Sequence, residues 1–219
     1  MNIAIDGPAG AGKSTIAKIL AARLGILYLD TGAMYRAIGY KAIKSGVSVT
    51  DLESVEKMLK ETDVDVKVAD GVQHVYVDGE DVSGVIRTPE VSKAASDISA
   101  LPPVRHAMVA LQRIIAAKQD TVLDGRDIGT FVLPKAEYKF FLTASAEERA
   151  KRRYKELVAR GEKCDLDKIR TDIETRDYND SHRALAPLKK ADDAVEVDTT
   201  FMTIEEVADK LASYVKNRR

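Results

Sequence analysis

The feature that most constrains the fold stands at the beginning of the chain. A short apolar run, Ile3-Ala4-Ile5, leads directly into Gly7-Pro8-Ala9-Gly10-Ala11-Gly12-Lys13-Ser14. This is the G-x-x-x-x-G-K-S pattern of a phosphate-binding loop, which lies between a buried strand and a helix. Apolar residues at helical spacing predict that helix over residues 13–24, and Gly25 is placed to end it. The strand, loop and helix together predict an α/β fold.

Each residue type in the loop suits a polyphosphate. Glycines let the backbone N–H groups turn toward a phosphate, and the following helix adds the positive end of its dipole. Lys13 supplies a mobile charge for the β- and γ-phosphates, and the Ser14 hydroxyl can reach Mg²⁺. A glycine-rich turn with a chance lysine is the alternative, which the strand and helix disfavour. We expect Mg²⁺-ATP to be bound by Gly7, Pro8, Ala9, Gly10, Ala11, Gly12, Lys13, Ser14 and Thr15.

Strand and helix patterns alternate along the rest of the chain, which is typical of a mostly parallel sheet. Further buried runs occur at residues 26–29, 121–123, 138–142 and 194–197, and residues 204–215 form an amphipathic helical pattern. We therefore predict a P-loop kinase-type core with a five-stranded parallel sheet flanked by helices.

One stretch departs from this alternation. Residues 64–68 alternate with period two, Asp70-Gly71 is a turn signal, and residues 74–77 form a second short strand pattern. Such alternation indicates a sheet with one face in water. We predict a small antiparallel insert, separate from the main sheet.

Composition argues against several classes of protein. The chain has 34 Lys and Arg against 35 Asp and Glu, without the basic excess of nucleic-acid or membrane-surface proteins. Its single cysteine, Cys164, cannot form an internal disulfide, which favours a reducing cytosol. No apolar run is long enough to span a bilayer, and the opening residues lack a signal-peptide pattern. We expect a cytoplasmic protein that binds neither nucleic acid nor membrane.

The loop alone leaves GTPases, motors and small-molecule kinases open, although the Asn-Lys-x-Asp guanine reader is absent. Asp124 ends the strand at 121–123, where an acid can hold Mg²⁺ through water; capping of the next turn is the alternative. Arg36 and Arg126 also follow predicted strands. Because the carboxyl ends of parallel strands share one sheet edge, the two guanidinium groups could face one anionic group.

Two charged clusters lie further along the chain. The helix opening at Glu148 is rich in basic residues and could close over the polyphosphate as a lid. It could equally be an ion-paired surface helix. Arg176, Asp180 and Arg183 share one helix face at spacing i, i+4, i+7. That stripe could read a sugar and a phosphate, or be a surface ion-pair ladder of little energetic value.

These segments together resemble the bacterial cytidylate kinases over essentially the whole chain. The matching motifs are Ile5-Asp6-Gly7 through Ser14, Leu29-Asp30-Thr31-Gly32-Ala33-Met34-Tyr35-Arg36, Asp81-Val82-Ser83-Gly84-Val85-Ile86-Arg87, Asp124-Gly125-Arg126-Asp127-Ile128-Gly129-Thr130 and Arg176-Asp177 through Arg183-Ala184. Each motif is moderately specific, and their order and spacing make the set highly specific. The family often has Ser where this chain has Thr31, which keeps the hydroxyl.

The resemblance implies Mg²⁺-ATP-dependent phosphorylation of CMP and dCMP, by a monomer. It implies that the CMP pocket is lined by Thr31, Tyr35 and Arg36, and that the CMP phosphate is approached by Arg36, Arg126 and Arg183. It also implies that cytosine is contacted by Ser96, Arg105 and Asp127, and the sugar by Arg176 and Asp180. Lys13, Arg126, Arg149 and Arg153 are the expected catalytic residues, Arg152 an ATP-binding residue, and Ser14 and Asp124 the metal-binding residues.

The resemblance also implies a division of the chain into three regions. The core comprises residues 1–30, 85–145 and 168–219, residues 31–84 form a monophosphate-binding region with an insert near 64–80, and residues 146–167 form the lid. Another small P-loop kinase, acting on UMP, AMP or shikimate, is the runner-up. A further alternative is an ATP-gated switch that transfers no phosphate.

Overall fold

The computed structural model describes residues 1–69 and 72–216, which pack as two compact units. The first unit runs over Met1–Tyr28 and resumes at Gln119, and the second is Leu29–Lys118. Residues 85–118, assigned to the core from the sequence, therefore pack with the second unit. The three-region division by function stays a prediction.

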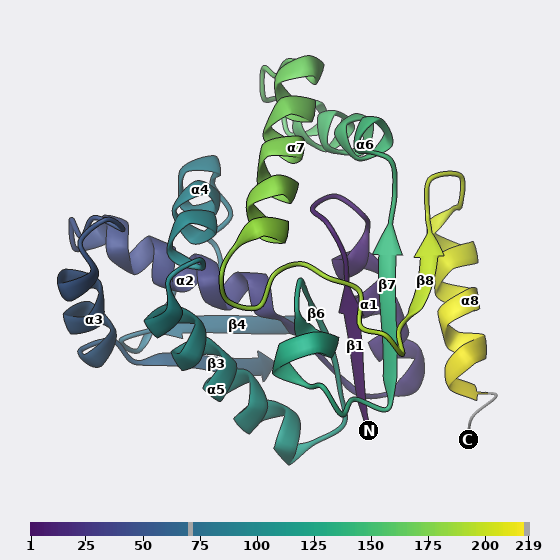
Figure 1. Cartoon of the computed structure of the whole chain (residues 1–219), viewed down its shortest axis with the longest axis horizontal. Helices are drawn as coiled ribbons and strands as arrows, with labels where there is room; N and C mark the ends of the chain where they lie inside the picture. Colours follow the sequence, from purple (N-terminus) through teal and green to yellow (C-terminus); the bar gives the residue numbers. More distant parts are fainter. Residues whose placement is uncertain (70–71, 217–219) are drawn as a thin grey trace. The chain divides into compact units, whose positions relative to one another are not determined.

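The main sheet has five strands in the order β2-β6-β1-β7-β8, which confirms the predicted architecture (Figure 1). The strands are β1 (Asn2–Asp6), β2 (Leu27–Asp30), β6 (Thr121–Gly125), β7 (Tyr138–Thr143) and β8 (Val195–Asp198). β1 pairs in parallel with both β6 and β7, with Ile3 opposite Val122 and Tyr138. The loop after β1 therefore leaves the sheet beside the carboxyl ends of both neighbours, which is where ligands bind in open α/β sheets.

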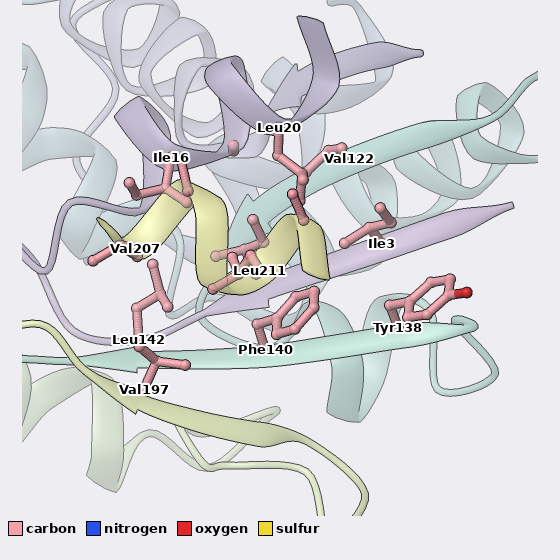
Figure 2. Close-up of a cluster of buried hydrophobic side chains, with 14 of the residues drawn as sticks. Ile3, Ile16, Leu20, Val122, Tyr138, Phe140, Leu142, Val197, Val207 and Leu211 are labelled. Atoms are coloured by element: carbon pink, nitrogen blue, oxygen red, sulfur yellow. The ribbon is translucent and has the colours of Figure 1, made fainter. Parts of the chain in front are cut away.

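Two helices of the first unit build its core against the sheet. Helix α1 (Lys13–Leu24) and helix α8 (Ile204–Lys216) contribute Ile16, Leu20 and Leu211 to a buried cluster with Phe140 (Figure 2). Burying side chains of this size stabilises a fold by roughly 1.5–3 kcal/mol each. This packing fixes the start of α1, and with it the loop that precedes α1.

Helices α6 (Ala146–Ala159) and α7 (Leu166–His182) follow β7 and pack on each other through a small apolar cluster of Ala150, Leu157, Ile169 and Ile173. Gly161 has a φ of 77° just after α6, as expected for a residue that breaks the helix. A short π-helical turn, η1 (Ile128–Val132), lies between β6 and β7.

The second unit combines four helices with the predicted insert. Its elements are α2 (Thr31–Lys44), α3 (Leu52–Lys60), β3 (Val64–Ala69), β4 (Val72–Val77), β5 (Glu80–Asp81), α4 (Pro89–Ile98) and α5 (Pro102–Lys118). β3, β4 and β5 form a separate antiparallel sheet, which confirms the insert. Val75 and Val77 on one face of β4 pack with α2 and α4 residues. The predicted Asp70-Gly71 turn lies outside the described residues.

None of the helices in the described ranges combines the length and the apolarity needed to cross a membrane.

Candidate active site

The phosphate loop joins β1 to α1 in a conformation that depends on glycine. Gly7 has a φ of 146°, and a Cβ there would overlap the carbonyl oxygen of Leu142. Gly10 has a φ of 77°, and a Cβ there would lie 3.1 Å from the Cβ of Arg149. The strand, loop and helix expected from the sequence are all present. The loop is held against both the sheet and helix α6.

Lys13 is buried at the first turn of α1, where its Nζ donates a hydrogen bond of 2.7 Å to the carbonyl oxygen of Pro8. Burial, together with the nearby charge of Arg126, lowers the pKa of the Lys13 ammonium well below its ordinary value. An anionic phosphate would favour the charged form again. Lys13 therefore lies within the loop, where a bound anion would stabilise its protonated, charged form.

The two residues expected to hold Mg²⁺ contact each other. The Ser14 hydroxyl donates to Oδ2 of Asp124 over 2.7 Å, and the Tyr28 hydroxyl donates to Oδ1 over 2.9 Å. Both partners present hard oxygen atoms, which suit Mg²⁺. In the part of the chain that the structure describes, no three His, Cys, Asp or Glu side chains gather as a metal cluster. Mg²⁺ at nucleotide sites needs only one or two carboxylates together with phosphates and water.

Asp6, the last residue of β1, is a buried carboxylate with no role predicted from the sequence. Its Oδ1 accepts the N–H of Ile128 at 2.8 Å, and its Oδ2 accepts the N–H of Gly129 at 2.7 Å. Burial raises the pKa of Asp6 to about 7, although the two N–H groups oppose the rise. The side chain thereby fixes the backbone immediately after Asp127.

The segment after β6 and the end of α7 form a buried network of acids and arginines. Arg126 Nε lies 2.8 Å from Oδ2 of Asp180, and Arg183 lies 3.0 Å from Oδ1 of Asp127. Arg176 and Arg183 also approach Asp180, at 4.0 and 3.9 Å. Although burial raises the pKa of Asp180, Arg126 and Arg176 hold it below its ordinary value. Of the predicted stripe, Asp180 and Arg183 are therefore buried and paired, whereas the Arg176 side chain is 41% exposed at its edge.

Arg149, at the start of α6, is buried and donates to the phosphate loop. Its Nη1 lies 2.9 Å from the carbonyl oxygen of Ala9 and 2.6 Å from Oδ2 of Asp177. Arg152 donates to the carbonyl oxygen of Thr199 at 2.6 Å. These two arginines are anchored by unit-one residues, and the role of α6 as a lid stays a prediction.

The exposed side of α6 carries ion pairs, as expected for the alternative in which this basic segment is an ion-paired surface helix. Lys151 lies 2.6 Å from Glu147, and Arg153 lies 3.1 Å from Glu156. All four side chains are substantially exposed, so these contacts contribute little to stability. The basic helix is thus partly a salt-bridged surface, and Arg153 is directed to a surface carboxylate.

In the second unit, Asp30 caps α2 and pairs with two arginines. Its Oδ1 accepts the N–H of Ala33, and its Oδ2 lies 2.9 Å from Arg36 and 3.3 Å from Arg87. The side-chain amide of Gln73, on the insert, accepts the N–H of Asp30 at 2.7 Å and donates to its carbonyl oxygen at 3.2 Å. The insert thereby holds the start of the helix that carries Arg36.

Four of the residues expected near the acceptor, Thr31, Tyr35, Ser96 and Arg105, lie within this unit. Arg105 is fully buried, and its guanidinium carbon lies 5.6 Å from the centre of the Tyr35 ring. Its Nη1 donates to the carbonyl oxygen of Ser99, and the Ser99 hydroxyl donates to the carbonyl oxygen of Ser96. Thr31 is buried as the first residue of α2. An arginine is rarely buried to this extent unless its polar groups have partners.

Four residues that organise these sites had no role predicted from the sequence: Asp6, Asp30, Gln73 and Tyr28. Asp6 and Asp30 both end strands, which is the signal that had singled out Asp124, so the same rule would have found them. Gln73 and Tyr28 carry no local signal, because their partners are remote in sequence.

The strand, glycine loop and helix, with a buried lysine and a Ser–Asp pair at the carboxyl edge of a parallel sheet, define a P-loop kinase core. A solved structure of an uncharacterized protein from Eubacterium ventriosum ATCC 27560 shares the fold, with a TM-score of 0.52 and 12% sequence identity. That match covers 99% of this chain and 98% of the other.

Sequence relatives define the family more narrowly. The family model described as cytidylate kinase matches residues 3–217. Proteins named cytidylate kinase from Geobacillus sp. (strain WCH70) and Lactobacillus johnsonii (strain CNCM I-12250 / La1 / NCC 533) are each 52% identical to this chain. The alignments cover 100% of this chain in both cases, and 97% and 95% of the relatives. The chain belongs to the cytidylate kinase family.

Proposed function

We propose that this protein transfers the γ-phosphoryl group of ATP to CMP or dCMP, giving ADP and CDP or dCDP. The observation that carries the proposal is the pairing of a complete phosphate loop with the buried carboxylate–arginine network of Asp127, Asp180, Arg126 and Arg183. The loop suits a polyphosphate donor, and the network suits an acceptor that combines an anionic group with hydrogen-bonding groups. Membership of the cytidylate kinase family supports this acceptor.

Cytosine recognition is assigned to Asp127, Arg105 and Ser96. Cytosine offers a donor at N4 and acceptors at N3 and O2, so a carboxylate and a guanidinium are complementary to it. Uracil presents the opposite groups at positions 4 and 3. Each mismatched buried group costs roughly 1–3 kcal/mol. We assign Thr31, Tyr35 and Arg36 to the CMP pocket, Arg126 and Arg183 to the phosphate with Arg36, and Arg176 and Asp180 to the sugar.

The reaction needs positioned charge more than covalent chemistry. Negative charge spreads over the equatorial oxygens of the phosphoryl group as it moves, and Lys13 with Arg126, Arg149 and Arg153 is proposed to balance it. Arg152 is assigned to ATP. The acceptor phosphate is already anionic at neutral pH, so no general base is assigned. Exclusion of water by the proposed lid would direct the phosphoryl group to CMP instead of hydrolysis.

Mg²⁺ is the expected cofactor, and the contact between Ser14 and Asp124 supports it, because both supply hard oxygen donors. Bound there, Mg²⁺ would neutralise charge on the β- and γ-phosphates of ATP. We further propose that the protein acts as a monomer in the cytoplasm. Sedimentation of the purified protein with and without nucleotides tests the monomer.

The experiment that tests the function measures ATP consumption with CMP, dCMP, UMP and AMP side by side, with identification of the products by chromatography. The proposal expects CDP and dCDP to form in proportion to ADP. ADP formed without a diphosphate of the acceptor would indicate an ATPase switch. Faster turnover of AMP or UMP than of CMP would assign the enzyme to another acceptor.

A further inference from the structure

Asp6 is the buried acid of the first unit for which the proposed reaction has no use. The other buried carboxylates of this unit's network, Asp127 and Asp180, pair with arginines. Asp6 instead accepts hydrogen bonds through both carboxylate oxygens, from the consecutive backbone N–H groups of Ile128 and Gly129. These partners lie more than a hundred residues further along the chain. The contact therefore serves tertiary placement and not local capping.

The position of Asp6 gives this contact a consequence. Asp6 directly precedes Gly7, whose backbone lies against the Leu142 carbonyl so closely that no Cβ fits. On the other side, Ile128 directly follows Asp127, and Arg126 precedes it. The carboxylate thus joins the fixed end of the phosphate loop to the segment that carries two proposed acceptor-binding side chains.

The segment after Asp127 has no regular strand or α-helix to hold it. Asp127 itself has φ −144° and ψ 24°, and it is followed by the π-helical turn η1, a rare conformation that is held by its surroundings. The N–H groups at the start of such a turn have no partner inside it. Asp6 supplies the partner for two of them, the N–H groups of Ile128 and Gly129.

We propose that Asp6 is a positioning residue for the acceptor site: it holds the backbone at Ile128 and Gly129 so that Arg126 and Asp127 are placed relative to the phosphate loop. This inference rests on the proposed function, because it assigns Asp127 to the base and Arg126 to the phosphate. Burial of a carboxylate is costly unless its hydrogen bonds are satisfied, and here both oxygens are satisfied by the segment that they hold. A pKa raised to about 7 is the sign of that desolvation.

The test uses Asp6→Asn and Asp6→Ala in the full chain, with the KM for CMP, the KM for ATP and kcat measured below the melting temperature of each variant. Asn keeps one acceptor and points an NH₂ group at the other N–H, whereas Ala removes both acceptors. We expect kcat/KM for CMP to fall roughly tenfold in Asp6→Asn and further in Asp6→Ala, because Asn loses one of the two hydrogen-bond acceptors and Ala loses both. The affinity for ATP, measured by binding alone, changes less than threefold.

Leu211→Ala is the matched control for destabilisation. Leu211 is fully buried in the same unit, on α8, and it has no part in the proposed site. We expect Leu211→Ala to lower the melting temperature and to leave the KM for CMP within twofold of wild type. If Asp6→Ala does not fold, Asp6→Asn and the amide exchange of Ile128 and Gly129 in it still decide the matter. We expect those two amides to exchange at least tenfold faster in the variant.

Unchanged kcat/KM for CMP in Asp6→Asn, or the same loss in Leu211→Ala, would overturn the positioning role. The result is separable from the proposed function. If wild type phosphorylates another acceptor, the comparison is repeated with that acceptor, and Asp6 is judged by the change it causes there. If wild type transfers no phosphate at all, the proposed function fails while the exchange measurement still reports the hold on residues 128 and 129.

Discussion

Asp180 is the residue whose removal tests the buried network most sharply. Its side chain is only 11% exposed, and it lies 2.8 Å from Arg126, 3.9 Å from Arg183 and 4.0 Å from Arg176. The substitution Asp180→Asn keeps the shape of the side chain and removes its charge. Three arginines are then left around a neutral amide, which can accept through one oxygen only.

The distances give the size of the effect. At an effective dielectric constant of about 20, the 2.8 Å contact is worth about 6 kcal/mol and each of the two longer contacts about 4 kcal/mol. Desolvation of Asp180 cancels much of this attraction, and removal of one partner from a buried ion pair generally costs about 3–5 kcal/mol. We expect Asp180→Asn to lower the free energy of unfolding by about 3 kcal/mol at neutral pH.

Urea unfolding followed by circular dichroism measures this loss, with Asp209→Asn as the control. Asp209 makes an equally short contact with Arg23, at 2.7 Å, but is 72% exposed, so its substitution costs below about 1 kcal/mol. Because the pKa of Asp180 is held low, its contribution is present above about pH 4 and is lost as the pH falls further. A loss in Asp180→Asn no larger than in the control would refute the reasoning.

Four further predictions follow from the same sites. Lys13→Ala lowers kcat by roughly 10²–10³. The melting temperature of this variant stays at or above that of wild type, because a buried charge is removed. A fully active variant refutes the role of Lys13. Arg105→Met lowers kcat/KM for CMP by roughly 10–100-fold and for UMP by less, and equal losses on both nucleotides contradict its assignment to cytosine. Asp124→Asn raises the Mg²⁺ concentration for half-maximal activity, and an unchanged magnesium titration excludes Asp124 from the metal site. Burial raises the pKa of Asp6 to about 7, with Asp127 and Lys13 as the charges facing it. Its favourable contribution to folding, complete below about pH 4, is therefore lost as the pH rises to about 7. The unfolding free energy of wild type relative to Asp6→Asn should fall between about pH 4 and pH 7, and a flat difference contradicts the shift.

Much of the fold could be predicted because its signals are local. The phosphate loop needs glycines at Gly7 and Gly10 for backbone conformations that other residues rarely adopt, so the loop can be read directly from the sequence. The buried runs at residues 121–123 and 138–142 are short and apolar, as expected for strands covered on both faces. The insert could be predicted because its strands alternate with period two.

The parts that escaped prediction depend on contacts between residues remote in sequence. The amide of Gln73 matters only because the insert brings it to the backbone of Asp30. The stripe at Arg176 to Arg183 could be a surface ladder or a buried network, because helical spacing does not say which face is covered. The contact that distinguishes the two possibilities comes from outside the helix: Arg126, at the end of β6, pairs with Asp180. A charged residue looks the same in a sequence whether it is solvated or buried. Its role can therefore be assigned only once the fold around it is known.

The central claim is that the acceptor site reads cytosine. It is tested most directly by internal competition: wild-type enzyme with ATP and equimolar CMP and UMP, with CDP and UDP separated and quantified early in the reaction. The ratio of the two products is the ratio of the two kcat/KM values. With two mismatched groups against uracil, each costing roughly 1–3 kcal/mol, we predict that CDP exceeds UDP by at least about 30-fold. Comparable amounts of CDP and UDP would contradict the account.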